Sequence, residues 1–122
     1  MGRRLFILGI LAAGALATGL VGIAALAPDA SGTTNAKYSV TARDFRFVIV
    51  PTRLRAGTHT FTVVNRGQAT HDFKIGTKKT RLLNPGQRQT IKVTLKKGRR
   101  YTVICTVPGH AALGMKKTLV AR

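Results

Sequence analysis

The stretch YTVICTVPGHAALGMKKTLVA, residues 101–121, contains the only cysteine of the chain. Cys105 ends a short run of β-forming residues, His110 follows five positions later, and Met115 follows after five more. Thiolate, imidazole and thioether are soft or borderline ligands, and together they suit copper. Each residue taken singly is compatible with a core or loop role, but the regular spacing of all three favours a metal site.

A trigonal copper site of this chemistry needs a second histidine beside the cysteine, the first histidine and a weak axial methionine. Of the other two histidines, His71 is the candidate, because it follows a loop in NRGQATHDF (65–73) and begins a predicted strand. We expect His59 to be a solvated surface residue, on the face of its strand opposite Phe61 and Val63.

The rest of the chain from residue 37 onward is organised as short alternating runs separated by turn residues. Expected strands are YSVTA (38–42), FRFVIV (45–50), THTFTVVN (58–65), HDFKIG (71–76), RQTIKVTL (88–95), YTVIC (101–105) and KTLVA (117–121). No sustained helical periodicity interrupts them. Seven or eight short strands at this spacing predict an all-β sandwich.

Charge and cysteine content limit the classes of function. The 122 residues include 21 Lys and Arg, three Asp and no Glu, a net charge of +18. Beyond residue 30 the net charge is +17, with 19 basic and two acidic residues. Such a surface attracts anionic partners, although most of these charges also suit the solvated faces of strands. A single cysteine excludes an internal disulfide and zinc sites built from paired cysteines.

The N-terminal segment differs from the rest of the chain. Two arginines precede 23 uncharged residues, Leu5 to Ala27, which is long enough to form a helix across a bilayer. We interpret residues 1–30 as a signal peptide or membrane anchor and residues 31–36 as a linker. The positive flank predicts a domain outside the cytoplasm, and RRLFIL is also similar to a twin-arginine export motif.

Residues 37–122 resemble the cupredoxins, the blue copper proteins of the plastocyanin and azurin type. NRGQATHDF is similar to the family's Asn-x-Gly segment followed by the first copper histidine. Residues 101–121 are similar to its last two strands and the ligand loop between them. The resemblance implies an eight-stranded Greek-key sandwich with one type 1 copper at one end. The implied ligands are His71, Cys105, His110 and Met115.

Asp72 departs from the family pattern, because several members have asparagine there, tying the two ligand loops together. An ionised carboxylate accepts hydrogen bonds but cannot donate them. The departure therefore concerns the rigidity and reduction potential of the site rather than metal binding. We interpret Tyr101 as a structural corner and not as a redox relay.

The resemblance implies one-electron transfer between redox partners through the edge of His110. An apolar collar would surround that edge, and two lysines would favour an acidic partner; the expected docking residues are Pro108, Ala111, Ala112, Leu113, Lys116 and Lys117. An anionic membrane surface is a further candidate partner. Nucleic acid is not expected, because the domain is exported and lacks interleaved exposed aromatic residues. We expect a monomer.

Enzymatic function is not expected. All four ligand positions would be occupied by protein, whereas catalytic metal sites keep a position open for substrate. Multicopper oxidases and copper nitrite reductases need more histidines than the three in this chain. Two alternatives stay open: an extracytoplasmic copper carrier with the same ligands and no electron-transfer role, and a metal-free basic β-domain that binds anionic polymers or membranes.

Overall fold

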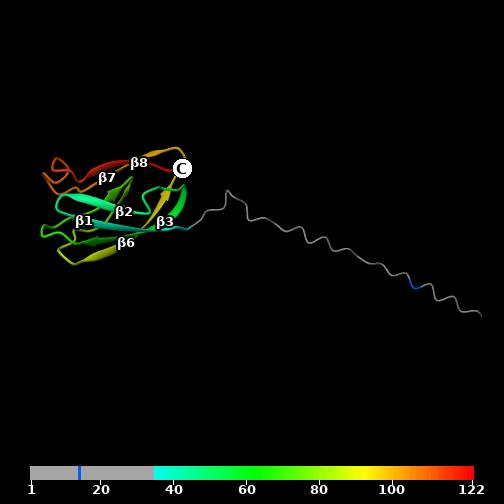
Figure 1. Ribbon diagram of the computed structural model, residues 1–122, viewed down its shortest axis with the longest axis horizontal. Coiled ribbons are helices and arrows are strands. Elements are labelled where there is room, and N and C mark those ends of the chain that lie inside the picture. The colour runs from blue at the N-terminus through cyan, green and yellow to red at the C-terminus, as the bar shows by residue number, and fades with distance from the viewer. Residues whose placement is uncertain (1–13, 15–34) are drawn as a thin grey trace, which may run out of the picture. The chain divides into compact units, whose positions relative to one another are not determined.

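A computed structural model describes Gly14 and residues 35–122 (Figure 1). The predicted N-terminal helix and all but the last two residues of the predicted linker lie outside the described residues. The chain divides into two units at residue 30, and residues 35–122 belong to the second unit. In the part of the chain that the structure describes, no helix is long and apolar enough to cross a membrane.

Residues 37–120 form eight β-strands, which confirms the all-β prediction. The strands are β1 (Lys37–Arg43), β2 (Arg46–Val50), β3 (Gly57–Asn65), β4 (Lys74–Ile75), β5 (Lys78–Lys79), β6 (Arg88–Leu95), β7 (Arg100–Ile104) and β8 (Lys116–Val120). Within the expected strand 71–76, only Lys74–Ile75 form a strand, β4, which pairs with β5 in a short hairpin. His71 forms an isolated bridge with Leu83, on the other side of the hairpin. The eighth strand therefore comes from this hairpin.

The strands form two four-stranded sheets, with the orders β2-β1-β3-β6 and β5-β4-β7-β8. All neighbours are antiparallel except β1 and β3, which are parallel. The chain passes from one sheet to the other after β3, after β5 and after β6. These crossings produce the predicted Greek-key sandwich.

Alternating side chains of both sheets form the core, because successive residues of a strand point to opposite faces. Phe61 on β3 stacks on Tyr38 of β1, with 4.7 Å between ring centroids. Across the sandwich, Phe61 and Phe47 pack against Phe73, which directly precedes β4, at 6.1 and 5.3 Å. Phe73 is fully buried. The aromatic contacts thus anchor the second sheet two residues from His71.

One end of the sandwich gathers the segments that carry the predicted ligands. The loop after β3 and the loop between β7 and β8 both lie at the left end in Figure 1, away from the entry of the chain into β1. Strands β3 and β7 belong to different sheets. A site at this end therefore receives its side chains from both layers.

The prediction that His59 is a solvated residue is wrong. His59 is 1% exposed and lies on the same face of β3 as Phe61 and Val63, since all three positions are odd-numbered. Its Nε2 lies 2.7 Å from the carbonyl oxygen of Arg55, and its Nδ1 accepts a hydrogen bond from the Ala36 amide at 3.0 Å. His59 is a hydrogen-bonded core residue at the end opposite the ligand loops.

Tyr101 has the expected structural role. Its side chain is 8% exposed, and its hydroxyl accepts a hydrogen bond from the backbone amide of Lys96 at 2.7 Å. This contact closes the turn that takes the chain from β6 in one sheet to β7 in the other. The Tyr101 hydrogen bond therefore helps to fix the start of β7, the strand that leads to Cys105.

We predict that His59→Ala lowers the free energy of unfolding by roughly 3 kcal/mol, because it leaves a cavity in the core and an unpaired, partly buried amide at Ala36. Urea unfolding of the copper-free chain measures this. Lys92→Ala, an exposed change on the adjacent strand β6, is the control and should alter stability by less than about 0.5 kcal/mol. Equal stability of the two variants would contradict the structural role of His59.

Candidate metal centre

Backbone hydrogen bonds fix the position of His71. It lies between β3 and β4, and its amide and carbonyl form two hydrogen bonds with Leu83, at 3.0 and 2.7 Å. The side chain is fully buried. This two-bond clamp fixes the direction in which the imidazole leaves the chain.

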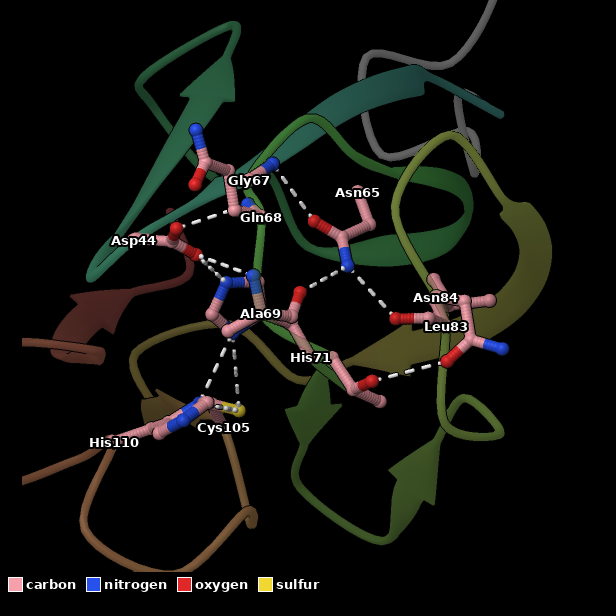
Figure 2. A network of polar contacts seen from close by, with 11 residues as sticks. Asp44, Asn65, Gly67, Gln68, Ala69, His71, Leu83, Asn84, Cys105 and His110 are labelled. Atoms are coloured by element: carbon pink, nitrogen blue, oxygen red, sulfur yellow. Dashed lines mark hydrogen bonds and ion pairs between the residues drawn. The ribbon is translucent and has the colours of Figure 1, made fainter.

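Asn65 organises the loop between β3 and His71. It is fully buried, and its side-chain amide donates to the carbonyls of Ala69 and Leu83, both at 2.8 Å. Its side-chain oxygen accepts from the Gly67 amide at 2.8 Å (Figure 2). Asn65 therefore satisfies the turn internally and ties it to the segment that clamps His71, which explains the Asn-x-Gly pattern in structural terms.

Cys105 follows the last residue of β7 and is 1% exposed. Its amide donates to the carbonyl oxygen of Met115 at 3.1 Å, so the two ends of the ligand loop are joined directly. Burial raises the pKa of the Cys105 thiol above its ordinary value. The metal-free protein therefore carries a neutral thiol at neutral pH, and a metal that binds the thiolate displaces its proton.

His110 lies in the series of turns that spans residues 107–114. Its amide donates to the Val107 carbonyl at 3.1 Å, and its own carbonyl accepts from the Met115 amide at 3.1 Å. The imidazole packs against Phe45, with 4.9 Å between ring centroids. His110 is partly exposed, whereas His71 and Cys105 are buried.

The three side chains converge on one point. The donor atoms of His71, Cys105 and His110 all lie within 4.8 Å of one another. The two Nδ1 atoms are 3.1 Å apart, and the Cys105 Sγ lies 4.0 Å from the Nδ1 of His71 and 3.6 Å from that of His110. Atoms that bind one metal at about 2.0–2.3 Å are separated by roughly 3–4 Å, so the donor set fits a single ion.

Met115 completes the predicted set. It is fully buried, and its amide and carbonyl bond to His110 and Cys105 respectively. Two imidazoles, one thiol and one thioether are the donor types of a type 1 copper site. The structure thus brings together the donor atoms of three of the four residues that the sequence analysis named, and it joins the backbone of Met115 to two of them.

A family model of copper binding proteins, the plastocyanin/azurin family, matches residues 34–122. The chain belongs to this family. Copper is therefore its cofactor, and His71, Cys105, His110 and Met115 are arranged as a type 1 copper site. The cupredoxin match extends over the whole β-sandwich, including both ligand loops. No curated protein sequence is significantly similar to the chain.

Solved structures share the cupredoxin fold. Auracyanin of the photosynthetic bacterium Roseiflexus castenholzii matches with a TM-score of 0.60 and 19% identity, over 75% of this chain and 99% of that one. Auracyanin A, a blue copper protein of Chloroflexus aurantiacus, matches with a TM-score of 0.61 and 16% identity, over 73% and 100%. A copper-containing nitrite reductase of Thermus scotoductus matches with a TM-score of 0.54 and 17% identity, over 73% and 28%. The cupredoxin thus corresponds to one part of the larger enzyme.

Asp72 joins the two ligand loops, although it stands where several cupredoxins have asparagine. Its fully buried carboxylate accepts hydrogen bonds from the Thr106 amide at 2.6 Å and from the Thr106 hydroxyl. The Lys79 ammonium group lies 3.4 Å from the same carboxylate. Because the neighbouring groups are donors, a carboxylate suits this position. The departure therefore preserves the tie next to Cys105 and adds a buried charge.

Sequence reasoning missed Asp44 and Phe45, which lie between β1 and β2 and contact the ligands. The Asp44 Oδ1 is 2.6 Å from the Nε2 of His71. The Phe45 ring packs edge-on to both imidazoles, with centroids 6.0 Å from that of His71 and 4.9 Å from that of His110. A usable signal existed for Asp44, since it is one of only three acids in a chain with 21 basic residues.

The predicted docking residues surround His110 in the sequence. Pro108, Ala112, Lys116 and Lys117 are exposed, Ala111 is partly exposed, and Leu113 is 62% exposed. A largely exposed leucine beside a partly exposed ligand is the arrangement that a small apolar contact surface requires. The role of these residues in docking stays a prediction.

We predict that Asp72→Ala lowers the free energy of unfolding of the cupredoxin by about 1–3 kcal/mol, since two Thr106 donors lose their acceptor. Asp72→Asn is the matched control, because its amide oxygen can still accept from the Thr106 amide. It should lose less than half as much stability. Urea unfolding of the copper-free chains measures both. If both variants match the wild type, Asp72 does not tie the loops.

Proposed function

We propose that this cupredoxin transfers single electrons between redox partners, with copper bound by His71, Cys105, His110 and Met115. Bound copper supplies the one-electron chemistry. The supporting observation is that the donor atoms of both histidines and the cysteine already lie within 4.8 Å of one another, on hydrogen-bonded loops from two sheets. A site that is preorganised in this way resists rearrangement between oxidation states, and electron transfer requires little reorganisation.

The burial of the ligands defines the proposed route for electrons. His71, Cys105 and Met115 are at most 1% exposed, whereas the imidazole of His110 is partly exposed. The edge of His110 therefore offers the shortest connection between the site and a partner. Protein ligands fill the proposed positions, so we infer that the chain is not an enzyme.

We infer that the partner is a redox protein with an acidic docking face. Exposed Lys116 and Lys117 directly follow Met115 and start strand β8. Opposite charges on the two proteins would accelerate their encounter, while the apolar contact around Leu113 would remain small and allow rapid dissociation. The net charge of +17 beyond residue 30 also allows contact with an anionic membrane surface.

We propose that the domain works outside the cytoplasm, in the periplasm or at the outer face of the cytoplasmic membrane. The support is the apolar segment Leu5 to Ala27 with arginines before it. Residues 1–30 would act as a cleaved signal or as an anchor. We also infer that the domain acts as a monomer.

Titration of the full chain with Cu(II) tests the ligand set. We expect an intense blue or green absorption at one copper per chain and a matching EPR signal, both lost in Cys105→Ser. Met115→Leu is the comparison, because the removal of a weak axial ligand should retain the colour. Copper that binds equally well without Cys105 would contradict the proposed ligand set, and a chain that stays colourless would favour the metal-free basic domain.

The release of copper from the protein distinguishes an electron carrier from a copper carrier. An electron carrier should keep its copper through repeated cycles of chemical reduction and oxidation, whereas a copper carrier should lose it to a competing chelator in the reduced state. Retention of more than about nine-tenths of the colour after ten cycles with a Cu(I) chelator present would support electron transfer. Progressive loss would favour the carrier.

The docking surface predicts a charge-dependent rate. Oxidation of the reduced protein by the anion ferricyanide should slow several-fold in Lys116→Gln/Lys117→Gln and with added salt, because screening and charge removal both weaken attraction. Lys96→Gln/Lys97→Gln, in the exposed turn after β6, removes the same charge elsewhere and is the control. Equal rates for the two double variants, measured by stopped flow, would place electron entry away from Lys116 and Lys117.

A further inference from the structure

His71 has a carboxylate partner on the side away from the other ligands. The Asp44 Oδ1 lies 2.6 Å from the His71 Nε2, and the two side chains are 28% and 0% exposed (Figure 2). A carboxylate can only accept, so Nε2 donates the proton. The Nδ1 of the neutral imidazole is then free of a proton, and it is this atom that faces His110 at 3.1 Å and Cys105 at 4.0 Å.

The carboxylate of Asp44 is itself held in place. The Gln68 amide donates to its Oδ2 at 2.9 Å, and the Ala69 amide donates to its Oδ1 at 3.2 Å. These bonds come from the loop that leads into His71. These backbone donors suit an ionised carboxylate and give Asp44 a defined orientation.

Gly67 leaves the room that this contact needs. A Cβ atom at this position would collide with the Oδ1 of Asp44 and would lie 2.9 Å from the Nε2 of His71. The Gly67 amide is meanwhile bonded to Asn65. The glycine of the Asn-x-Gly segment thus allows the loop to approach the two side chains closely, so the contact is built into the local sequence.

The contact between Asp44 and His71 also places a negative charge beside the proposed copper site of a strongly basic domain. Beyond residue 30 the chain has only two acidic residues among 19 basic ones. Both are next to the ligands, Asp44 on the His71 ring and Asp72 on the residue after Cys105. A basic surface disfavours the more highly charged Cu(II) form, and a fixed carboxylate on a ligand opposes that effect.

We propose that Asp44 is a positioning residue of the copper site, which fixes the orientation and the proton of His71 and stabilises the Cu(II) form over the Cu(I) form. This inference rests on the proposed ligand set. Asp44 acts through the imidazole of His71. Its carboxylate makes the imidazole a stronger donor to the metal. It also offsets the positive charge of the rest of the domain.

Asp44→Asn tests the proposal, with Gln68→Lys as the matched control. Both variants make the local charge more positive by one, but Gln68→Lys keeps the Asp44–His71 bond because the bond at residue 68 comes from the backbone. We expect Asp44→Asn to weaken Cu(II) binding about 10–100-fold with little change in Cu(I) binding. Each tenfold change raises the reduction potential by about 59 mV.

The reduction potential, measured by voltammetry on the copper-loaded full chain, should rise in Asp44→Asn at least twice as much as in Gln68→Lys. Equal shifts would overturn the proposal, since they would show only a general effect of charge. Gly67→Ala is a second variant, which keeps the acid but displaces it from His71. It should shift the potential in the same direction, and an unchanged potential would also overturn the proposal.

Nitrogen-15 NMR of the wild-type Cu(I) protein tests the positioning without any variant. We expect the His71 proton on Nε2, slow to exchange with solvent, and a proton on Nδ1 or rapid exchange would overturn the proposal. The experiments distinguish a failure of the proposed ligand set from a failure of the inference about Asp44. A wild type without Cys105-dependent colour would overturn the ligand set and this inference together, whereas a blue wild type with an unshifted Asp44→Asn would overturn this inference alone.

Discussion

The hydrogen bonds between Asp72 and Thr106 are the interaction on which the ligand end depends. Asp72 follows His71 on the way from β3 to β4, and Thr106 follows Cys105 at the end of β7. A fully buried carboxylate without donors would be costly, so the two loops are stable only when they are together. The same contact holds His71 and Cys105 within reach of one metal ion.

Other contacts hold the rest of the site close to His71 and Cys105. Packing of Phe61 on Phe73 holds the two sheets together close to His71. The hydrogen bond from Cys105 to Met115 closes the ligand loop, and that loop presents His110 at the surface. At this end His71, Cys105 and Met115 are buried and His110 is partly exposed, which is the arrangement that the proposed electron transfer requires.

The strands and the ligands could be predicted because their signals are local. Alternation of apolar residues identified all strands except the β4–β5 hairpin, whose two-residue strands are too short to show a period. His59 was misassigned although its burial follows from the same alternation, with Phe61 and Val63 on its face of β3. A polar side chain on a buried face is stable there only because Ala36, Arg55 and Ala56 bond to both ring nitrogens.

Local patterns in the sequence were enough to predict the fold class, the copper family and the four candidate ligands, since spacing within a loop and alternation within a strand are properties of adjacent residues. Only the tertiary structure showed that Asp72 bonds to Thr106 and that Asp44 bonds to His71. These partners are separated by 34 and 27 positions, and no local pattern encodes such a pairing. The folding of two sheets around one core brings them together, and it places the two acidic residues beyond residue 30 beside the metal ligands.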